Sequence, residues 1–403
     1  MSLTQTSIQG AFWLGLLKVV IKAFSFVKLI VIARILTPFD LGLFGIIMLP
    51  YGLVEVATES GINQALVQSR KDHKLYLSSA WLAFIFRGVL LFSVLYLSAP
   101  FISRYYQQDL TLMIRLVALT PLLKGLANPG VIMFKKYFHY QQEFFFQAVI
   151  SLSESVATIV FCLWLKSVIA LPLGVVIGGL TTLIISFFVT QFDWVKPRFK
   201  KIVELYRYGR WVTLGTFISY VNDQGDDFLV SKVLGAGALG FYQTAYKISN
   251  LPTTQGAGLI YQVIFPLFSS IQNETVRLKR GLIKALLITF ALSFGFSAVV
   301  YLLAPFLVNL FFGPAWMPLI PALNVLLLFG LTRPLISVGA AVFDAVGQPK
   351  TIAGLNLIRL LIMVVLLFPL TKTYGIVGTA WAVVIAQICV YPWFIVKLKQ
   401  VFS

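Results

Sequence analysis

The fold of this chain is decided by the segment Ala11–Ala33, which reads AFWLGLLKVVIKAFSFVKLIVIA. Nearly all of its 23 residues are apolar, and a helix of about 20 such residues crosses roughly 30 Å of hydrocarbon. No basic region precedes the segment and no small-residue cleavage site follows it, so we expect a helix of the mature protein rather than a signal peptide. Its three lysines are unusual, because charged side chains inside membrane spans are rare and commonly functional.

Apolar segments of similar length recur along the whole chain. Hydrophobic residues make up 59% of its 403 residues and charged residues 11%, with a mean hydropathy of +0.90. Soluble domains carry about 25% charged residues, so the composition excludes an ordinary soluble protein. We expect an all-α polytopic membrane protein with about 12 transmembrane helices, at residues 11–33, 41–66, 77–98, 111–133, 144–165, 168–192, 210–233, 239–268, 282–303, 319–343, 351–370 and 375–396.

Lysine and arginine are distributed unevenly between the loops on the two sides of these spans. The loops after even-numbered spans, together with the C-terminus, hold 18 of the 32 basic residues, whereas the loops after odd-numbered spans hold 5. Because cytoplasmic loops are enriched in basic residues, this predicts a multi-pass protein of the bacterial cytoplasmic (inner) membrane with both termini in the cytoplasm. The net charge of +18 is spread over short loops and spans, so it does not indicate nucleic-acid binding.

The two halves of the sequence resemble each other. Leu36–Gly45 (LTPFDLGLFG) matches Leu234–Gln243 (LGAGALGFYQ) at an offset of 198 residues, and further matches follow at 205 and 209. Short matches also arise by chance in apolar sequences, but the ordered offsets favour a repeat of six spans. A repeat with an even number of spans keeps its orientation, which predicts two parallel six-helix bundles, at residues 1–200 and 201–403, that rock against each other.

Charged residues inside the spans are the main indication of function. A basic residue at a helix centre costs about 2.5–3.5 kcal/mol on insertion scales, so it must face a wet cavity, pair with an acid or extend to the surface. With Arg210, Lys232 and Lys284 at span ends counted among the loop residues, nine basic residues lie in the predicted spans: Lys18, Lys22, Lys28, Arg87, Arg115, Lys124, Lys247, Arg333 and Arg359. Six acids accompany them: Glu55, Glu59, Glu154, Asp223, Asp226 and Asp227. The positive excess favours an anionic substrate such as a pyrophosphate.

The first two spans carry facing charges. Lys18 and Lys22 are four residues apart and therefore share a helix face, with Lys28 about a quarter turn away. By residue count from the cytoplasmic ends, they lie near the depths of Glu59 and Glu55 on the second span. We expect ion pairs or shared solvation there, with the three lysines as substrate-binding residues and the two glutamates as coupling or ion-pair residues.

The seventh and eighth spans repeat this arrangement with more acid. Lys247 is expected near the depth of Asp223 and Asp226. We interpret Lys247, together with Arg333, as substrate-binding and the two aspartates as coupling or ion-pair residues. The remaining charges have structural alternatives: Arg87 and Glu154 as structural pairs, and Arg115 and Lys124 as side chains that extend to the membrane surface.

The turns at Ala33–Phe44 (ARILTPFDLGLF) and Leu234–Tyr242 (LGAGALGFY) resemble those of the polysaccharide and O-antigen (Wzx-type) flippase branch of the MOP superfamily. That superfamily also contains the MATE drug exporters and the lipid II flippase, and the resemblance covers essentially the whole chain. It implies two six-helix lobes arranged as a V, alternating access and a cationic central cavity with basic residues on the first, second, seventh and eighth spans.

The resemblance also implies a substrate and partners. The substrate would be a polyprenyl-pyrophosphate-linked oligosaccharide, moved from the cytoplasmic to the periplasmic leaflet. The partners would be membrane lipids and other polysaccharide-assembly proteins. No cofactor or metal is expected, apart from a coupling proton or sodium ion.

Two other functions remain open from sequence. A cation-coupled drug exporter of the same fold would use Glu55, Glu59, Asp223 and Asp226 for its coupling ion, but a cationic drug favours an acidic cavity. A membrane-embedded polysaccharide polymerase or glycosyltransferase needs catalytic residues at the periplasmic face, and the longest predicted periplasmic loop, 304–318, holds no charged residue. No HExxH, GxSxG, P-loop or CxxC motif is present, so we expect a transporter and not an enzyme.

Overall fold

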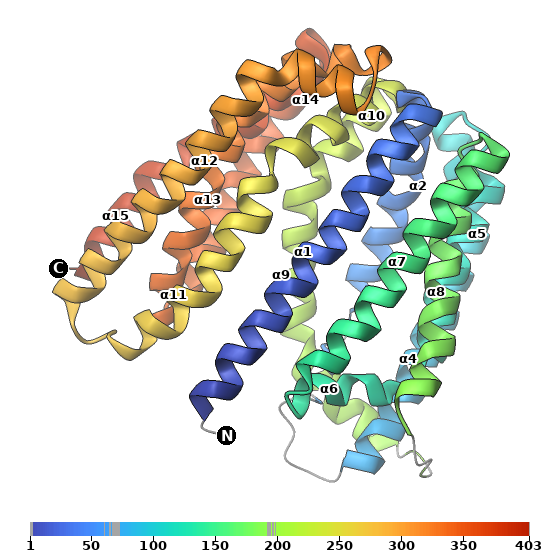
Figure 1. Cartoon of the computed structure of the whole chain (residues 1–403), viewed down its shortest axis with the longest axis horizontal. Coiled ribbons are helices and arrows are strands. Elements are labelled where there is room, and N and C mark those ends of the chain that lie inside the picture. The colour runs from blue at the N-terminus through green and yellow to red at the C-terminus, as the bar shows by residue number, and fades with distance from the viewer. Residues whose placement is uncertain are drawn as a thin grey trace. The chain divides into compact units, whose positions relative to one another are not determined.

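The structure is a computed structural model, and all its regular elements are helices, as the sequence predicts (Figure 1). It describes residues 3–59, 61–63, 66, 73–191, 195, 197 and 199–402, but not the side chains of residues 3–12, 14, 18, 73–75 and 199–215. The chain divides into two compact units, Met1–Val221 and Asn222–Ser403. The boundary falls inside one long helix, α9 (Phe199–Val233).

The first unit holds the start of α9 and the helices that precede it. These are α1 (Leu3–Ile35), α2 (Pro38–Ala57), α4 (His73–Tyr106), α5 (Thr111–Leu126), η1 (Pro129–Ile132), α6 (Met133–Lys136), α7 (Tyr140–Leu165) and α8 (Ala170–Val189). In this unit α4 packs on α5, α7 packs on α8, and α1 runs alongside α7 (Figure 1).

The second unit holds the end of α9 and the helices that follow it. These are α10 (Gly235–Ser249), the π-helical segment η2 (Pro252–Ala257), α11 (Gly258–Ser270), α12 (Thr275–Phe311), η3 (Pro314–Leu319), α13 (Ile320–Ala345), α14 (Pro349–Cys389) and α15 (Tyr391–Phe402). Within this unit α13 packs against α10, α11, α12 and α14.

Seven helices within the described residues are long and apolar enough to cross a membrane, or eight if the bent pair of α5 with η1 and α6 forms one span. Helix α9 carries nine charged residues, and α10 and α11 have only 15 and 13 residues, so these helices do not meet such a criterion alone. The chain is thus a multi-pass helical membrane protein, while the number of 12 spans stays a prediction.

The two turns that mark the sequence repeat each join one helix directly to the next. Before α2, the Thr37 hydroxyl accepts a hydrogen bond from the Asp40 backbone N–H (3.2 Å), and the Asp40 carboxylate accepts one from the Thr37 N–H (2.9 Å). This capping box, with Pro38 at the first helical position, fixes where α2 begins. Between α9 and α10 the turn is made at Gly235, whose positive φ of +84° is a conformation that favours glycine.

Three predicted spans are shorter or more broken than the sequence suggested. Helix α2 ends at Ala57, where the Thr58 hydroxyl donates to the Val54 carbonyl, so the prediction that Glu59 lies on a helical face with Glu55 is wrong. The span predicted at 111–133 bends by 76° after α5, because the residues before Pro129 are extended. The span predicted at 239–268 is divided into α10, η2 and α11 at Pro252, which has no N–H to donate.

The predicted span 351–370 and most of the predicted span 375–396 lie in one helix, α14. Helix α14 contains a sharp break at Gly375, whose backbone angles of φ 60° and ψ −142° are not helical. The break coincides with the start of the span predicted at 375–396, whose C-terminal part falls in α15. Glycine is required here because other residues rarely adopt this conformation.

Helix α13 lies unusually close to α10 at Gly330. A Cβ atom built on Gly330 would lie 2.0 Å from the backbone carbonyl oxygen of Ser249. Small residues allow such close approach between membrane helices, where packing rather than the hydrophobic effect drives association. This contact matters because α13 carries Arg333, one turn further along the same helix.

We predict that Gly330→Ala destabilises the protein, because the new methyl group must push α13 away from α10. Overpacking of this kind costs about 1–3 kcal/mol. Gly295→Ala on α12 is the matched control, since nothing lies within 4 Å of its Cβ position. Melting temperatures in detergent should fall for Gly330→Ala and stay equal or rise slightly for Gly295→Ala; equal values for both variants would show that the close contact is not present.

Candidate functional site

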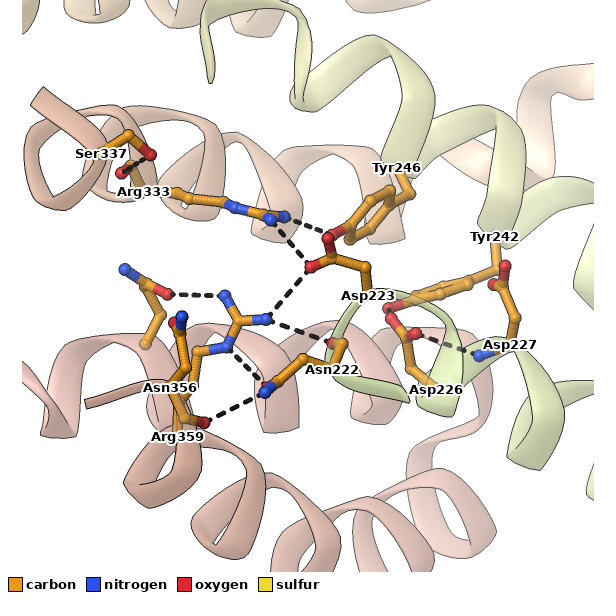
Figure 2. A network of polar contacts seen from close by, with 11 residues as sticks. Asn222, Asp223, Asp226, Asp227, Tyr242, Tyr246, Arg333, Ser337, Asn356 and Arg359 are labelled. Carbon is orange, nitrogen blue, oxygen red and sulfur yellow. Dashed lines mark hydrogen bonds and ion pairs between the residues drawn. The ribbon is translucent and has the colours of Figure 1, made fainter. Parts of the chain in front are cut away.

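A network of charged and polar side chains lies inside the second unit, where α9, α10, α13 and α14 meet (Figure 2). Helix α9 supplies Asn222, Asp223, Asp226 and Asp227. Helix α13 supplies Arg333 and helix α14 supplies Arg359. Helices α13 and α14, which carry the two arginines, are mostly apolar, so these cations need partners within the network.

Asp223 is the centre of this network. One of its carboxylate oxygens, Oδ1, accepts hydrogen bonds from Arg333 Nη2 at 2.8 Å and from Arg359 Nη2 at 3.3 Å (Figure 2). A single carboxylate therefore compensates two guanidinium groups. Arg333 also donates to the hydroxyl of Tyr246 at 2.9 Å, and its guanidinium lies 5.2 Å from the ring centre of Phe329.

The two arginines differ in how firmly they are held. Arg359 donates to the side-chain and backbone oxygens of Asn222 (3.3 and 3.2 Å) and to Gln387 Oε1 (3.4 Å). Its side chain is 10% exposed, against 19% for Arg333 and 41% for Asp223. Arg359 is therefore a fixed cation at the base of the network, while Arg333 and Asp223 form its more accessible edge.

The other two acids of α9 form a separate arm directed at α10. Asp226 Oδ2 accepts a hydrogen bond from the Tyr242 hydroxyl at 2.6 Å, and Asp227 Oδ2 accepts one from Gln243 Nε2 at 2.8 Å. Both carboxyl groups are buried. Lys247, predicted to lie close to Asp223 and Asp226, is exposed and interacts electrostatically with Asp227. The two cations that pair with Asp223 come from α13 and α14.

The first unit contains a second set of charges. Lys28 Nζ lies 2.6 Å from Glu154 Oε1 and so joins α1 to α7. The Glu55 carboxylate lies 4.0 Å from Lys124 Nζ on α5. Arg87 donates to the Thr58 hydroxyl (3.1 Å) and to the Glu55 carbonyl (2.7 Å), so it holds the end of α2 against α4.

A cavity of about 730 Å³ lies inside the first unit, lined mainly by residues of α2, α4, α5, η1, α6, α7 and α8. Six charged residues line it: Glu55, Arg87, Lys124, Lys135, Glu143 and Glu154. Lys135 Nζ lies 3.5 Å from the Glu143 carboxylate, which also accepts a hydrogen bond from Gln147 at 3.3 Å. No group of three histidine, cysteine or acidic side chains in the described parts of the chain could hold a metal ion.

The structure brings some predicted site residues together and separates others. Arg333 and Asp223 are paired, whereas Glu55 meets Lys124 rather than Lys22. Lys22 is exposed and makes no ion pair with any described side chain, and Glu59 is half-buried beyond the end of α2. The side chain of Lys18 lies outside the described residues. A role in substrate binding stays a prediction for all of these residues.

Sequence reasoning left Arg359 and its partners Asn222 and Gln387 out of the site, although it included Asp223. The signal was present, because an arginine in the middle of an apolar segment, three residues from Asn356, is a functional candidate by default. Its pairing with Asp223 could not be predicted, since it depends on how α9 and α14 are rotated. The structure also shows that Glu154 pairs with Lys28, so Arg87 and Glu154 do not pair with each other.

Comparison with known proteins places these features in a family. The family model described as "Polysaccharide biosynthesis protein" matches residues 31–321. The lipopolysaccharide biosynthesis protein WzxC of Escherichia coli strain K12 is 25% identical over 345 residues, which cover 83% of this chain and 68% of WzxC. The teichuronic acid biosynthesis protein TuaB of Bacillus subtilis strain 168 is 24% identical over 399 residues, covering 96% of this chain and 81% of TuaB.

Solved structures show the fold. An inward-facing MATE multidrug resistance transporter of the MOP superfamily superposes with a TM-score of 0.77 at 14% identity, covering 94% of both chains. The lipid II flippase MurJ in an inward closed conformation superposes with a TM-score of 0.74 at 18% identity, covering 96% of this chain and 89% of MurJ. The chain therefore belongs to the polysaccharide biosynthesis protein family, and its fold is that of the MOP superfamily.

Proposed function

We propose that this protein is a flippase that moves a polyprenyl-diphosphate-linked oligosaccharide from the cytoplasmic to the periplasmic leaflet of a bacterial inner membrane. The observation that carries the proposal is the pair of arginines, the buried Arg359 and the partly exposed Arg333, that share the partly exposed carboxylate of Asp223. The names of the relatives, which refer to lipopolysaccharide and teichuronic acid biosynthesis, support a saccharide substrate.

The difficult step of this transport is electrostatic. A diphosphate group cannot enter hydrocarbon without compensation, because an unpaired buried charge costs several kcal/mol. A planar guanidinium donates two parallel hydrogen bonds to phosphate oxygens and stays protonated at every relevant pH. Arg333 lies at the accessible edge of the network, so it is the residue that we expect to contact the diphosphate first.

Asp223 compensates the positive charge that the site would carry when no substrate is bound. Without a substrate, Arg333 would be left unpaired within the membrane, and Asp223 supplies the missing anion at 2.8 Å. When a diphosphate binds to Arg333, the Asp223 carboxylate keeps Arg359 as its partner, 3.3 Å away. The charge of Arg333 is then compensated both with and without substrate. A carrier needs this in order to return to its starting conformation after it has released the substrate.

The remaining features of the proposal follow the sequence predictions. Twelve spans in two six-helix lobes would alternate between inward-open and outward-open states, with both termini in the cytoplasm. The protein would act as a transporter and not as an enzyme, with membrane lipids and other polysaccharide-assembly proteins as partners. A coupling proton or sodium ion would be carried by an acid such as Asp226, the best buried of the four predicted coupling acids.

The fold alone does not separate this function from drug export, since the MATE transporters share it. The site does separate the two. A cationic drug needs an acid that is free to pair with it, whereas Asp223 already accepts from two arginines. The same network leaves arginine donors for an incoming anion, and we therefore favour the anionic lipid substrate.

We predict that Arg333→Gln lowers the transport of lipid-linked oligosaccharide into proteoliposomes by about 10- to 100-fold. A hydrogen bond to a charged group contributes about 1.5–3 kcal/mol, which corresponds to that range. Arg277→Gln is the matched control, because Arg277 is an exposed arginine of the same unit that pairs with the nearby Glu274, outside the network. A folded Arg333→Gln protein that transports at the wild-type rate would contradict the proposal, as would a wild type that moves only organic cations.

We further predict that Asp223→Asn tightens binding of farnesyl diphosphate and lowers the stability of the ligand-free protein. The change removes the resident anion that competes for Arg333 and leaves that arginine uncompensated. Thermal shift with and without farnesyl diphosphate measures both effects. Asp344→Asn is the control, since Asp344 accepts a hydrogen bond from Tyr261 and takes no part in the network. Weaker diphosphate binding by Asp223→Asn would show that the carboxylate is not a competitor.

A further inference from the structure

The cavity in the first unit has the size of a ligand site and no part in the arginine network. Its volume of about 730 Å³ falls in the range of roughly 300–1,000 Å³ that encloses drug-sized ligands. The side chains that line it come from helices spread over more than a hundred residues of sequence, from Glu55 on α2 to Thr182 on α8. Its chemistry therefore indicates what it can bind.

The charges of this cavity already compensate one another. Each lining carboxylate has a cation beside it: Lys124 at 4.0 Å from Glu55, Lys135 at 3.5 Å from Glu143 and Lys28 at 2.6 Å from Glu154. The remaining cation, Arg87, donates to a hydroxyl and to a carbonyl oxygen. A strongly charged ligand would have to break one of these pairs, so the cavity suits neither a diphosphate nor an organic cation.

The two charges of an ion pair neutralise each other, but the paired groups can still form further hydrogen bonds. A carboxylate has about four lone-pair sites and an ammonium group has three donors, so each ion pair can still bond to hydroxyl groups. The pair between Glu55 and Lys124 is the clearest example, because its 4.0 Å separation exceeds hydrogen-bond distance and both side chains are more than one-third exposed. A neutral ligand with many hydroxyls uses this capacity without disturbing the charge balance.

An unpartnered hydroxyl points to the same kind of ligand. Thr120 lines the cavity, is 1% exposed, and its hydroxyl has no hydrogen-bond partner among the described residues. An unsatisfied buried hydroxyl costs about 1–3 kcal/mol, so a ligand that supplies a partner recovers this energy. Thr120 and Lys124 are four residues apart on α5 and share one face of it.

Apolar side chains complete the lining, with Phe84 of α4 and Phe146 of α7 among them. A sugar ring presents hydroxyls at its edge and C–H groups on its faces, which matches a lining of paired ions, amides, a free hydroxyl and aromatic rings. We propose that this cavity binds sugar rings, as a subsite for the neutral, hydroxyl-rich part of the lipid-linked oligosaccharide. The inference rests on the proposed function, and it assigns the glycan to residues other than those proposed for the diphosphate.

The test compares two lipids on the full-length protein in nanodiscs, with affinities measured by native mass spectrometry. One is the lipid-linked oligosaccharide extracted from cells that synthesise it, and the other is undecaprenyl diphosphate without sugar. Thr120→Val should weaken binding of the sugar-bearing lipid by about threefold to tenfold, the worth of one hydrogen bond, and leave binding of the bare diphosphate unchanged. Thr120→Ser keeps the hydroxyl and should restore the wild-type affinity.

Ser155→Ala is the matched control for the loss of a buried hydroxyl. Within the described part of the chain the Ser155 hydroxyl is also without a hydrogen-bond partner, but Ser155 does not belong to the cavity lining. Ser155→Ala should change neither the affinity for the sugar-bearing lipid nor that for the bare diphosphate. If Thr120→Val weakens the binding of both lipids equally, or of neither lipid, the sugar subsite is refuted while the diphosphate mechanism stands. If the wild type binds neither lipid, the proposed function itself is refuted, and the subsite with it.

Discussion

The compensation of charge inside the membrane is the constraint on which the rest of this structure depends. Every helix that carries an ionised side chain into an apolar environment must bring it next to a partner, since an isolated charge there costs several kcal/mol. In the second unit this requirement ties α9, α13 and α14 together through Asp223 and its two arginines. The ion pairs thus fix the mutual rotation of the helices as well as the chemistry of the site.

The two units meet this constraint in different ways. In the first unit, ion pairs such as Lys28 with Glu154 join neighbouring helices and leave a polar cavity whose charges are compensated. In the second unit, the Asp223 carboxylate accepts from two guanidinium groups, while Asp226 and Asp227 bond to uncharged side chains of α10. The first arrangement suits a neutral hydroxyl-rich ligand and the second suits an anion, and a lipid-linked oligosaccharide contains both kinds of group.

Much of this could be predicted from sequence, because membrane helices follow from apolar length alone. The helical fold and the family are confirmed, and the turn at Thr37–Asp40 begins a helix where its capping residues indicate. Helix interruptions were harder to predict. Pro129 and Pro252 lie inside long apolar segments, which a hydropathy profile reads as uninterrupted spans. The helix is nevertheless interrupted there, because proline has no backbone N–H to donate.

The partners of the charged residues were the least predictable part. Residue counts place side chains at a depth, but they do not give the rotation of each helix about its axis. Lys247 and Lys22 were therefore expected beside acids that are paired with Arg333, Arg359 and Lys124 in the structure. Glu59 was assigned to a helix that ends two residues earlier, at Ala57, because the Thr58 hydroxyl bonds back to the preceding turn.

The proposed transport mechanism requires that a diphosphate takes the place of the Asp223 carboxylate on Arg333. Determination of the structure of the protein with bound polyprenyl diphosphate by electron cryomicroscopy tests it most directly. We predict phosphate density within hydrogen-bond distance of the Arg333 guanidinium, with Asp223 retained by Arg359 alone. Density for the diphosphate elsewhere, with Asp223 still bridging both arginines, would contradict the account.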